Sequence, residues 1–148
     1  MTRLGETNDP LALIPGNPAS IARVAGQMYG YGTMLAEAGD GLKRIDATDG
    51  WKGAAGDAFR QRFHGEPERW LTAAACFRDA AGALDHYLPT LAWAQQQAGV
   101  AIQLWNQGHK DAANSTLENA VGQLTAAART ATAAVGQARD QAPQKPGF

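Results

Sequence analysis

Apolar residues recur every three or four positions along residues 21–45, and this spacing predicts one long helix with a single apolar face. Asn17 or Ser20 can cap its start, and Pro18 suits the first turn, where a backbone N–H is not needed. Such a helix needs a partner to cover the face. The apolar positions, here called the seam, are Ile21, Val24, Met28, Tyr31, Leu35, Ala38, Leu42 and Ile45.

Glycines are unusually frequent in this predicted helix, although each costs up to about 1 kcal/mol relative to alanine in a helix interior. Ala25, Gly32 and Gly39 lie seven residues apart beside the seam. We expect these three to form a close-packing ridge that a neighbouring backbone can approach. The alternative is a poorly ordered helix that becomes regular only when it packs.

Further helical patterns fill the rest of the chain. A second helix is predicted from about residue 54 to 88, with a kink or short break near Gly65 because Pro67 follows closely. Pro89 is expected to start a third helix, with residues 95–97 (three glutamines) on its polar side. Residues 89–142 then form either one continuous helix or, as we favour, two helices separated between Gly108 and Ser115. Ser115 begins a possible capping box.

No alternating strand pattern is present, so the predicted class is all-α: an elongated helical hairpin extended to a three- or four-helix bundle. Residues 1–19 contain three prolines and predict an extended N-terminal arm. Residues 20–142 form the predicted helical domain, and residues 143–148 resemble the start of a linker. Trp70 and Trp105 match the apolar stripes and are expected in the core.

Composition excludes several classes of function. The formal net charge is −1 and no basic cluster exists, which argues against a nucleic-acid partner. No apolar run reaches the roughly 18 residues of a membrane-spanning helix, so no membrane span is expected. The first residues also lack the apolar core of a Sec signal peptide, so any export must use a non-Sec route.

Chemistry-bearing residues form no recognisable catalytic pattern. The three histidines are about twenty-two residues apart and make no metal-ligand pair, and no nucleophile or phosphate-binding motif occurs. We therefore expect a protein that is not an enzyme, with no catalytic residues, no metal site and no cofactor.

Two tryptophans are instead candidates for recognition. Trp51 and Gly53 lie at the joint between the first two predicted helices, where glycine allows a tight reversal and an indole can cap the hairpin core. Trp93 lies off the apolar stripe of its helix, so it either packs in an inter-helix groove or meets a partner.

Longer stretches around these residues resemble a known family. Trp51-Lys-Gly-Ala-Ala-Gly-Asp-Ala-Phe-Arg-Gln-Arg-Phe63, Pro67-Glu-Arg-Trp70, Leu91-Ala-Trp-Ala-Gln-Gln-Gln-Ala98 and the arm Asp9-Pro-Leu-Ala-Leu-Ile-Pro-Gly-Asn-Pro18 carry the similarity. The tripeptide Trp51-Lys-Gly53 looks like that of the WXG helical hairpins exported by type VII secretion. The full set resembles the type VII secretion domain at the N-terminus of actinobacterial polymorphic toxins.

The resemblance implies a non-catalytic targeting and delivery module of a larger effector, cytoplasmic before export and secreted by the type VII route. It also implies recognition by the secretion ATPase and pairing with a WXG-type partner chain or a second copy. One departure is that no tyrosine is followed four residues later by Asp or Glu, the export signal of many WXG pairs. The alternative is a structural or chaperone-like helical protein that pairs with itself or another helical protein.

Overall fold

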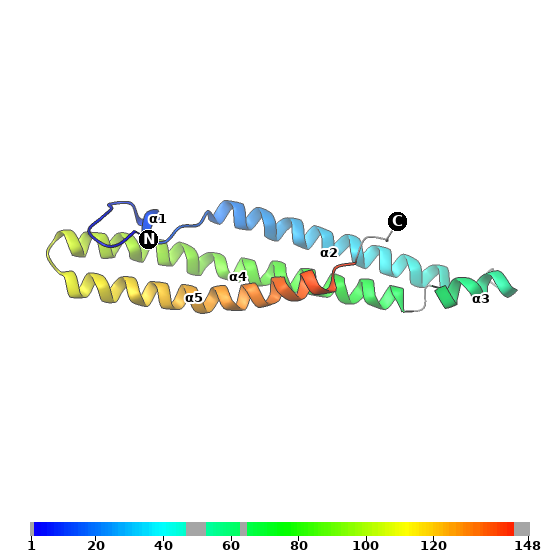
Figure 1. The fold of residues 1–148 in the computed structure, drawn as a ribbon. Coiled ribbons are helices and arrows are strands. Elements are labelled where there is room, and N and C mark those ends of the chain that lie inside the picture. Colours follow the sequence, from blue (N-terminus) through cyan, green and yellow to red (C-terminus); the bar gives the residue numbers. More distant parts are fainter. Residues whose placement is uncertain (1, 47–52, 63–64, 144–148) are drawn as a thin grey trace. The chain divides into compact units, whose positions relative to one another are not determined.

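The computed structural model describes residues 2–46, 53–62 and 65–143, and within them it contains helices and no strand. The all-α class is therefore confirmed. The chain divides into two compact units, residues 1–25 with 82–133 and residues 26–81 with 134–148, which are described separately below. The helices (Figure 1) are α1 (Pro10–Leu13), α2 (Pro18–Asp46), α3 (Gly53–Arg62), α4 (Glu66–Asn106) and α5 (Lys110–Gln141).

Helix α2 begins where local chemistry predicted. The Asn17 side-chain oxygen accepts hydrogen bonds from the backbone N–H groups of Ala19 at 3.0 Å and Ser20 at 3.2 Å. Pro18 occupies the first helical position, where its missing donor costs nothing. Asn17 is therefore the cap, and the helix starts two residues before the predicted boundary at residue 20.

The predicted break near Gly65 is confirmed. Helix α3 ends at Arg62 and α4 begins at Glu66. Gly65 has a φ of +81°, a left-handed conformation that glycine adopts without steric cost. The acidic residues Glu66 and Glu68 then lie in the first turn of α4, where the helix dipole favours negative charge.

The prediction that Pro89 starts a new helix is wrong, because α4 runs through it to Asn106. An interior proline removes one backbone hydrogen bond and costs about 3 kcal/mol. The side chain of Pro89 is exposed. Buried residues on either side, Ala81 before it and Leu91 after it, hold the flanking turns in their respective units and offset that cost.

The break predicted between Gly108 and Ser115 is confirmed, since α4 ends at Asn106 and α5 begins at Lys110, but the predicted start of the next helix at Ser115 is wrong. Gly108, with φ +89°, donates its N–H to the Trp105 carbonyl at 3.0 Å, and His109 donates to the Leu104 carbonyl at 2.9 Å. These two bonds form a Schellman motif that ends α4. The His109 carbonyl already accepts from the Ala113 N–H at 2.9 Å, so α5 begins before the capping box is reached.

In the first unit, the second half of α4 and the first half of α5 lie side by side and antiparallel (Figure 1). Their contact is built largely from small side chains, and Leu91 is the largest fully buried one in the described residues. Trp105 is only half-buried at the edge of this contact, rather than central as predicted. The buried alanines of α4 and α5 in this unit are Ala94, Ala98, Ala101, Ala113, Ala120 and Ala131.

The N-terminal arm also belongs to the first unit, and it is not extended throughout. Residues 10–13 form the single turn α1, which the Asp9 side chain caps by accepting from the Leu11 N–H at 3.0 Å. Four residues are too few to show helical periodicity in the sequence. Leu4 and Ile14 of the arm are buried, with 8% and 2% of their surface exposed.

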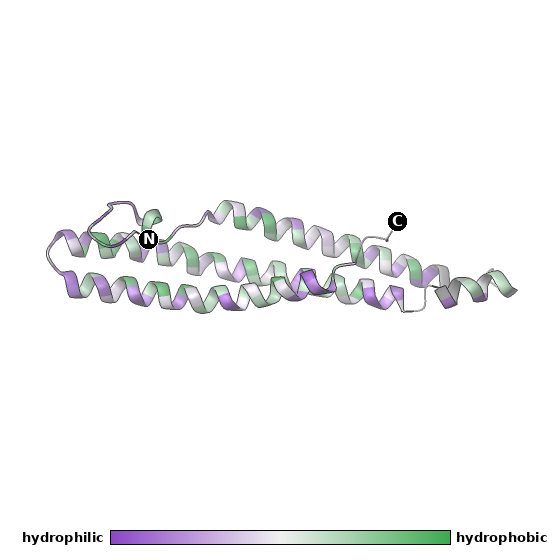
Figure 2. Ribbon diagram, viewed as in Figure 1, coloured by the Kyte–Doolittle hydropathy of each residue, from purple (hydrophilic) through white to green (hydrophobic). Residues whose placement is uncertain are grey.

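In the second unit, α2 and the first half of α4 pack antiparallel. Gly39 of α2 lies against Leu71 of α4, and Gly32 lies against Ala74, so the numbering of the two helices runs in opposite directions. Leu35, Ala73 and Ala74 form the buried cluster of this unit, and Trp70 is a half-buried neighbour rather than a central residue. Hydrophilic residues alternate with apolar ones along α2, α4 and α5 (Figure 2).

Candidate functional site

The α2–α4 contact in the second unit carries two of the three residues predicted to form a close-packing ridge. A Cβ placed on Gly32 would lie 3.0 Å from the carbonyl oxygen of Ala74. A Cβ on Gly39 would lie 3.0 Å from Cγ of Leu71 and 3.2 Å from the carbonyl oxygen of Pro67. Both glycines are buried, so α4 approaches the backbone of α2 closely at these two positions. Ala25 is also buried, at 2% exposure, but belongs to the first unit.

This close approach decides which part of the apolar seam is covered. Leu35 lies beside the ridge on one side and is 2% exposed. Tyr31, one turn earlier on the same side but further from the ridge, keeps 36% of its surface exposed, and Met34, just beyond the seam, keeps 53%. The seam of α2 is therefore covered along one edge only, and its other edge remains open in the second unit.

Aromatic and cationic side chains border this open edge and the opposite flank of the ridge. Tyr31 makes an edge-to-face contact with Phe77 of α4, with ring centroids 4.7 Å apart. Arg78 lies over the ring of Tyr29 at 5.8 Å from its centroid and donates to the Thr33 hydroxyl at 3.5 Å. Tyr29 itself is 56% exposed. The flanks can therefore offer aromatic faces and a guanidinium to another protein.

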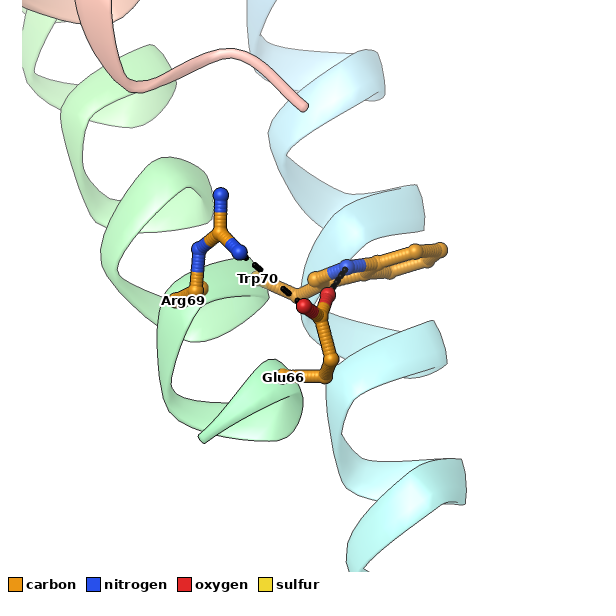
Figure 3. A network of polar contacts seen from close by, with 3 residues as sticks. All are labelled: Glu66, Arg69 and Trp70. Atoms are coloured by element: carbon orange, nitrogen blue, oxygen red, sulfur yellow. Dashed lines mark hydrogen bonds and ion pairs between the residues drawn. The ribbon is translucent and has the colours of Figure 1, made fainter. Parts of the chain in front are cut away.

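A polar network at the start of α4 orients Trp70 toward α2 (Figure 3). Glu66 accepts a hydrogen bond from the Trp70 indole at 3.3 Å through one carboxylate oxygen. Its other oxygen pairs with Arg69 at 3.0 Å. Because Glu66, Arg69 and Trp70 lie three and four residues apart, their side chains share one face of the helix. The indole is thereby held against the Leu35 cluster.

An exposed ion pair also joins the two helices. Lys43 of α2 lies 2.7 Å from the Glu68 carboxylate of α4. This hydrogen bond raises the pKa of the Lys43 ammonium above its ordinary value of 10.5, with smaller contributions from the charges of Glu68 and Asp40. Since both side chains are half or more exposed, the pair supports register more than stability.

The residues predicted to act in recognition are not brought together. Trp51 lies outside the described residues. Gly53 begins α3 with a φ of +83° and is exposed, and a Cβ there would meet no atom within 4 Å. Trp93 belongs to the other unit, where it is half-buried against the cluster of Ile14 and Leu91. The geometry of Gly53 fits a tight chain reversal, and that of Trp93 fits inter-helix packing.

One residue that the sequence placed on a polar face has a specific structural role. The side-chain amide of Gln95 donates to the carbonyl oxygens of Ile14 at 3.1 Å and Gly16 at 3.0 Å. It therefore fastens the N-terminal arm to α4. Its two neighbours, Gln96 and Gln97, are the same residue type, so composition and periodicity offered no signal that could distinguish it.

Two features are absent from residues 2–46, 53–62 and 65–143. No three His, Cys, Asp or Glu side chains gather there to hold a metal ion. No described helix has the length and apolar character to cross a membrane.

Comparison with known proteins identifies the family. The family model described as "Putative T7SS secretion signal domain" matches residues 2–114, which is more than half of the chain. Neither the curated proteins nor the solved structures gave a match. The matched range takes in the arm, α2, α3, α4 and the first residues of α5. The resemblance to a type VII secretion domain is thereby confirmed, and the chain belongs to the T7SS secretion signal domain family, with a role in type VII secretion.

Proposed function

We propose that this chain is a non-catalytic targeting and delivery module that marks a larger effector, a polymorphic toxin, for type VII export. The proposal rests on the observation that one family match covers the arm and the helices up to the start of α5. The secretion signal would then be a folded assembly of helices rather than a short linear peptide. Its activity would be recognition alone, and the toxic activity would belong to another domain of the effector.

The open edge of the α2 seam supports a second step of the proposal, which concerns partners. Tyr31 and Met34 expose large apolar surface along this edge. Gly30, on the same helix, has open space where a Cβ would stand. A helix from a WXG-type partner chain or from a second copy could pack there. The secretion ATPase would then recognise the folded pair in the cytoplasm before export.

The alternative is a chaperone-like or structural protein that uses the same edge to hold another helical protein. The observation in its favour is the same uncovered apolar edge. Light scattering of the purified chain, alone and with a candidate partner, separates the two ideas in part. A chain that forms stable pairs but supports no export would favour the alternative.

Export is the decisive measurement. A reporter fused after residue 148 should reach the medium in a strain with an active type VII ATPase and stay in the cells when the ATPase is inactivated. Trp51→Ala should abolish export, whereas Trp93→Phe, which keeps an aromatic ring on the core, should not. Unchanged export of the Trp51→Ala fusion, at equal cellular amounts, would contradict the assignment of the recognition residue. Export that persists without the ATPase would contradict the proposed function.

A further inference from the structure

The N-terminal arm runs along α4 in the opposite direction to that helix. Gly5 lies beside Trp105, Pro10 beside Gly99, and Gly16 beside Leu91. On α4 these contacts span fourteen residues, or about 21 Å at 1.5 Å per residue. One continuous face of α4 therefore receives the whole arm.

Two apolar side chains anchor the arm at its ends. Leu4 packs in the cluster that contains Ala101, Ile102 and Ala113. Ile14 packs in the cluster that contains Leu91 and the alanines of α4 and α5. The small side chains beneath allow each anchor to enter between the helices. Between the two anchors, Leu13 is half-buried against both clusters, whereas Leu11 is 50% exposed.

Gln95 forms hydrogen bonds with the backbone of the arm and not with its side chains. Its amide nitrogen donates to two carbonyls on either side of Pro15, the part-buried one of Ile14 and the exposed one of Gly16. Pro15 has no N–H and cannot donate a hydrogen bond itself, so these two carbonyls need a donor from another segment of the chain. One glutamine therefore supplies both donors and clamps the end of the arm.

The arm has glycine where the fit to α4 leaves no space. A Cβ on Gly5 would lie 2.8 Å from Nε1 of Trp105, and one on Gly16 would lie 3.2 Å from Cδ2 of Leu91. Both glycines also have positive φ values, +89° and +141°. Any other residue would be strained at both positions, would overlap the Trp105 indole at position 5 and would crowd the Leu91 side chain at position 16. The face of α4 thus selects a segment with an apolar anchor and a glycine near each end.

The ends of α2, α4 and α5 are closed without any residue that precedes Asn17. Asn17 caps α2 with its own side chain, and Asp9 caps α1 within the arm. The turn between α4 and α5 is closed by the Schellman bonds at Gly108 and His109. When the arm leaves α4, that helix loses side-chain hydrogen bonds, those of Gln95 to Ile14 and Gly16 and that of Asn106 to Asn8, while the caps of α2 and the α4–α5 turn stay in place.

We propose that the face of α4 and α5 beneath the arm is a binding site for a peptide with separated apolar anchors, and that the N-terminal arm occupies it as a strap. The strap leaves and returns as one unit while α4 and α5 stay folded. Recognition rests on the two apolar anchors, the two glycines and the Gln95 clamp. This inference stands whether or not the chain acts in export as proposed above.

Hydrogen exchange on the full chain tests the strap directly. Gln95→Ala removes two hydrogen bonds and should speed exchange of the arm amides by about tenfold, while exchange in α4 and α5 is unchanged. The adjacent, exposed Gln96→Ala is the matched control and should leave the arm amides as they are. The proposal is overturned if the arm and α4 exchange together, or if Gln95→Ala has no effect on the arm.

Peptide binding tests the site itself. Ile14→Asp in the full chain should dislodge the arm, because it places a charge in a position that is 2% exposed. A fluorescent peptide with the sequence of residues 2–17 should then bind this variant at least about tenfold more tightly than the wild-type chain, where the tethered arm competes at high local concentration. The same peptide carrying Ile14→Asp should not bind.

Absence of binding to an Ile14→Asp chain that keeps its helical circular dichroism would overturn the proposal, as would equal binding to both chains. If Ile14→Asp unfolds the chain, the exchange experiment on Gln95→Ala decides, since that substitution removes two side-chain hydrogen bonds and no buried anchor. Adding Gln95→Ala to the Ile14→Asp chain should lower its affinity for the peptide by about tenfold. An unchanged affinity would contradict the clamp.

Discussion

Glycine-to-alanine substitutions along α2 give opposite predictions at neighbouring positions. Gly26, Gly30 and Gly32 all lie inside the same helix and the same unit. A Cβ on Gly26 or Gly30 would meet no atom within 4 Å, whereas one on Gly32 would lie 3.0 Å from the Ala74 carbonyl oxygen. A backbone oxygen cannot rotate away, so the helices would have to separate.

The expected free energies follow from two terms. Alanine is favoured over glycine in a helix interior by about 1 kcal/mol, and this gain applies at all three positions. At Gly32 it is opposed by an overpacking cost of about 1–3 kcal/mol. We therefore expect Gly26→Ala and Gly30→Ala to stabilise the chain by up to about 1 kcal/mol each, and Gly32→Ala to destabilise it by about 0–2 kcal/mol.

The comparison between Gly30→Ala and Gly32→Ala is the sharpest readout, because the helix-propensity term cancels and only the close approach remains. Urea unfolding followed by circular dichroism and by tryptophan fluorescence measures the difference, and coincidence of the two signals checks that the transition is two-state. A thermal scan should separate the two variants by about 2–4 °C per kcal/mol. If Gly32→Ala stabilised the chain as much as Gly30→Ala, the close α2–α4 contact would be refuted.

Two further predictions concern the core and the inter-helix ion pair. Leu91→Ala should lower the free energy of unfolding by about 2–5 kcal/mol because Leu91 is 1% exposed, whereas Val121→Ala, at a 44% exposed site, should change it by no more than about 0.5 kcal/mol; urea midpoints of both variants check this. The raised pKa of Lys43 means that its pair with Glu68 stabilises the fold below pH 10.5, the ordinary lysine value, and that this small contribution is lost as the pH rises through the raised pKa. Glu68→Gln should therefore remove part of the alkaline decline in the urea midpoint, and an identical pH profile in both chains would contradict the pairing.

Helix ends were the most predictable part of the fold, because their causes are local. Asn17 and Pro18 together start α2. Glycine at positions 65 and 108 allows the positive φ values that interrupt the helical path between neighbouring helices. Pro89 shows the limit of such reasoning. Its cost is local, but packing of the flanking turns in the two units outweighs it, and no short sequence window contains that packing.

The candidate interaction residues were less predictable. The heptad spacing identified the apolar seam, yet only contact with α4 decides that Leu35 is buried while Tyr31 and Met34 remain exposed. Gln95 could not be distinguished from Gln96 in the sequence, because its role depends on carbonyls eighty residues away in the chain. Trp51, the strongest sequence signal, lies outside the described residues and stays a prediction.

The sequence by itself determined the helical class, the start of α2 at Asn17 and Pro18, the breaks near Gly65 and Gly108, and the excess of glycine on α2. These follow from period, capping and backbone freedom, which act over a few residues. Only the tertiary structure decided which glycines are needed for close packing, which edge of the seam is covered, and that the arm is fastened along α4. Those outcomes depend on which backbone lies within 3–4 Å of a given position, and residues remote in the sequence supply it.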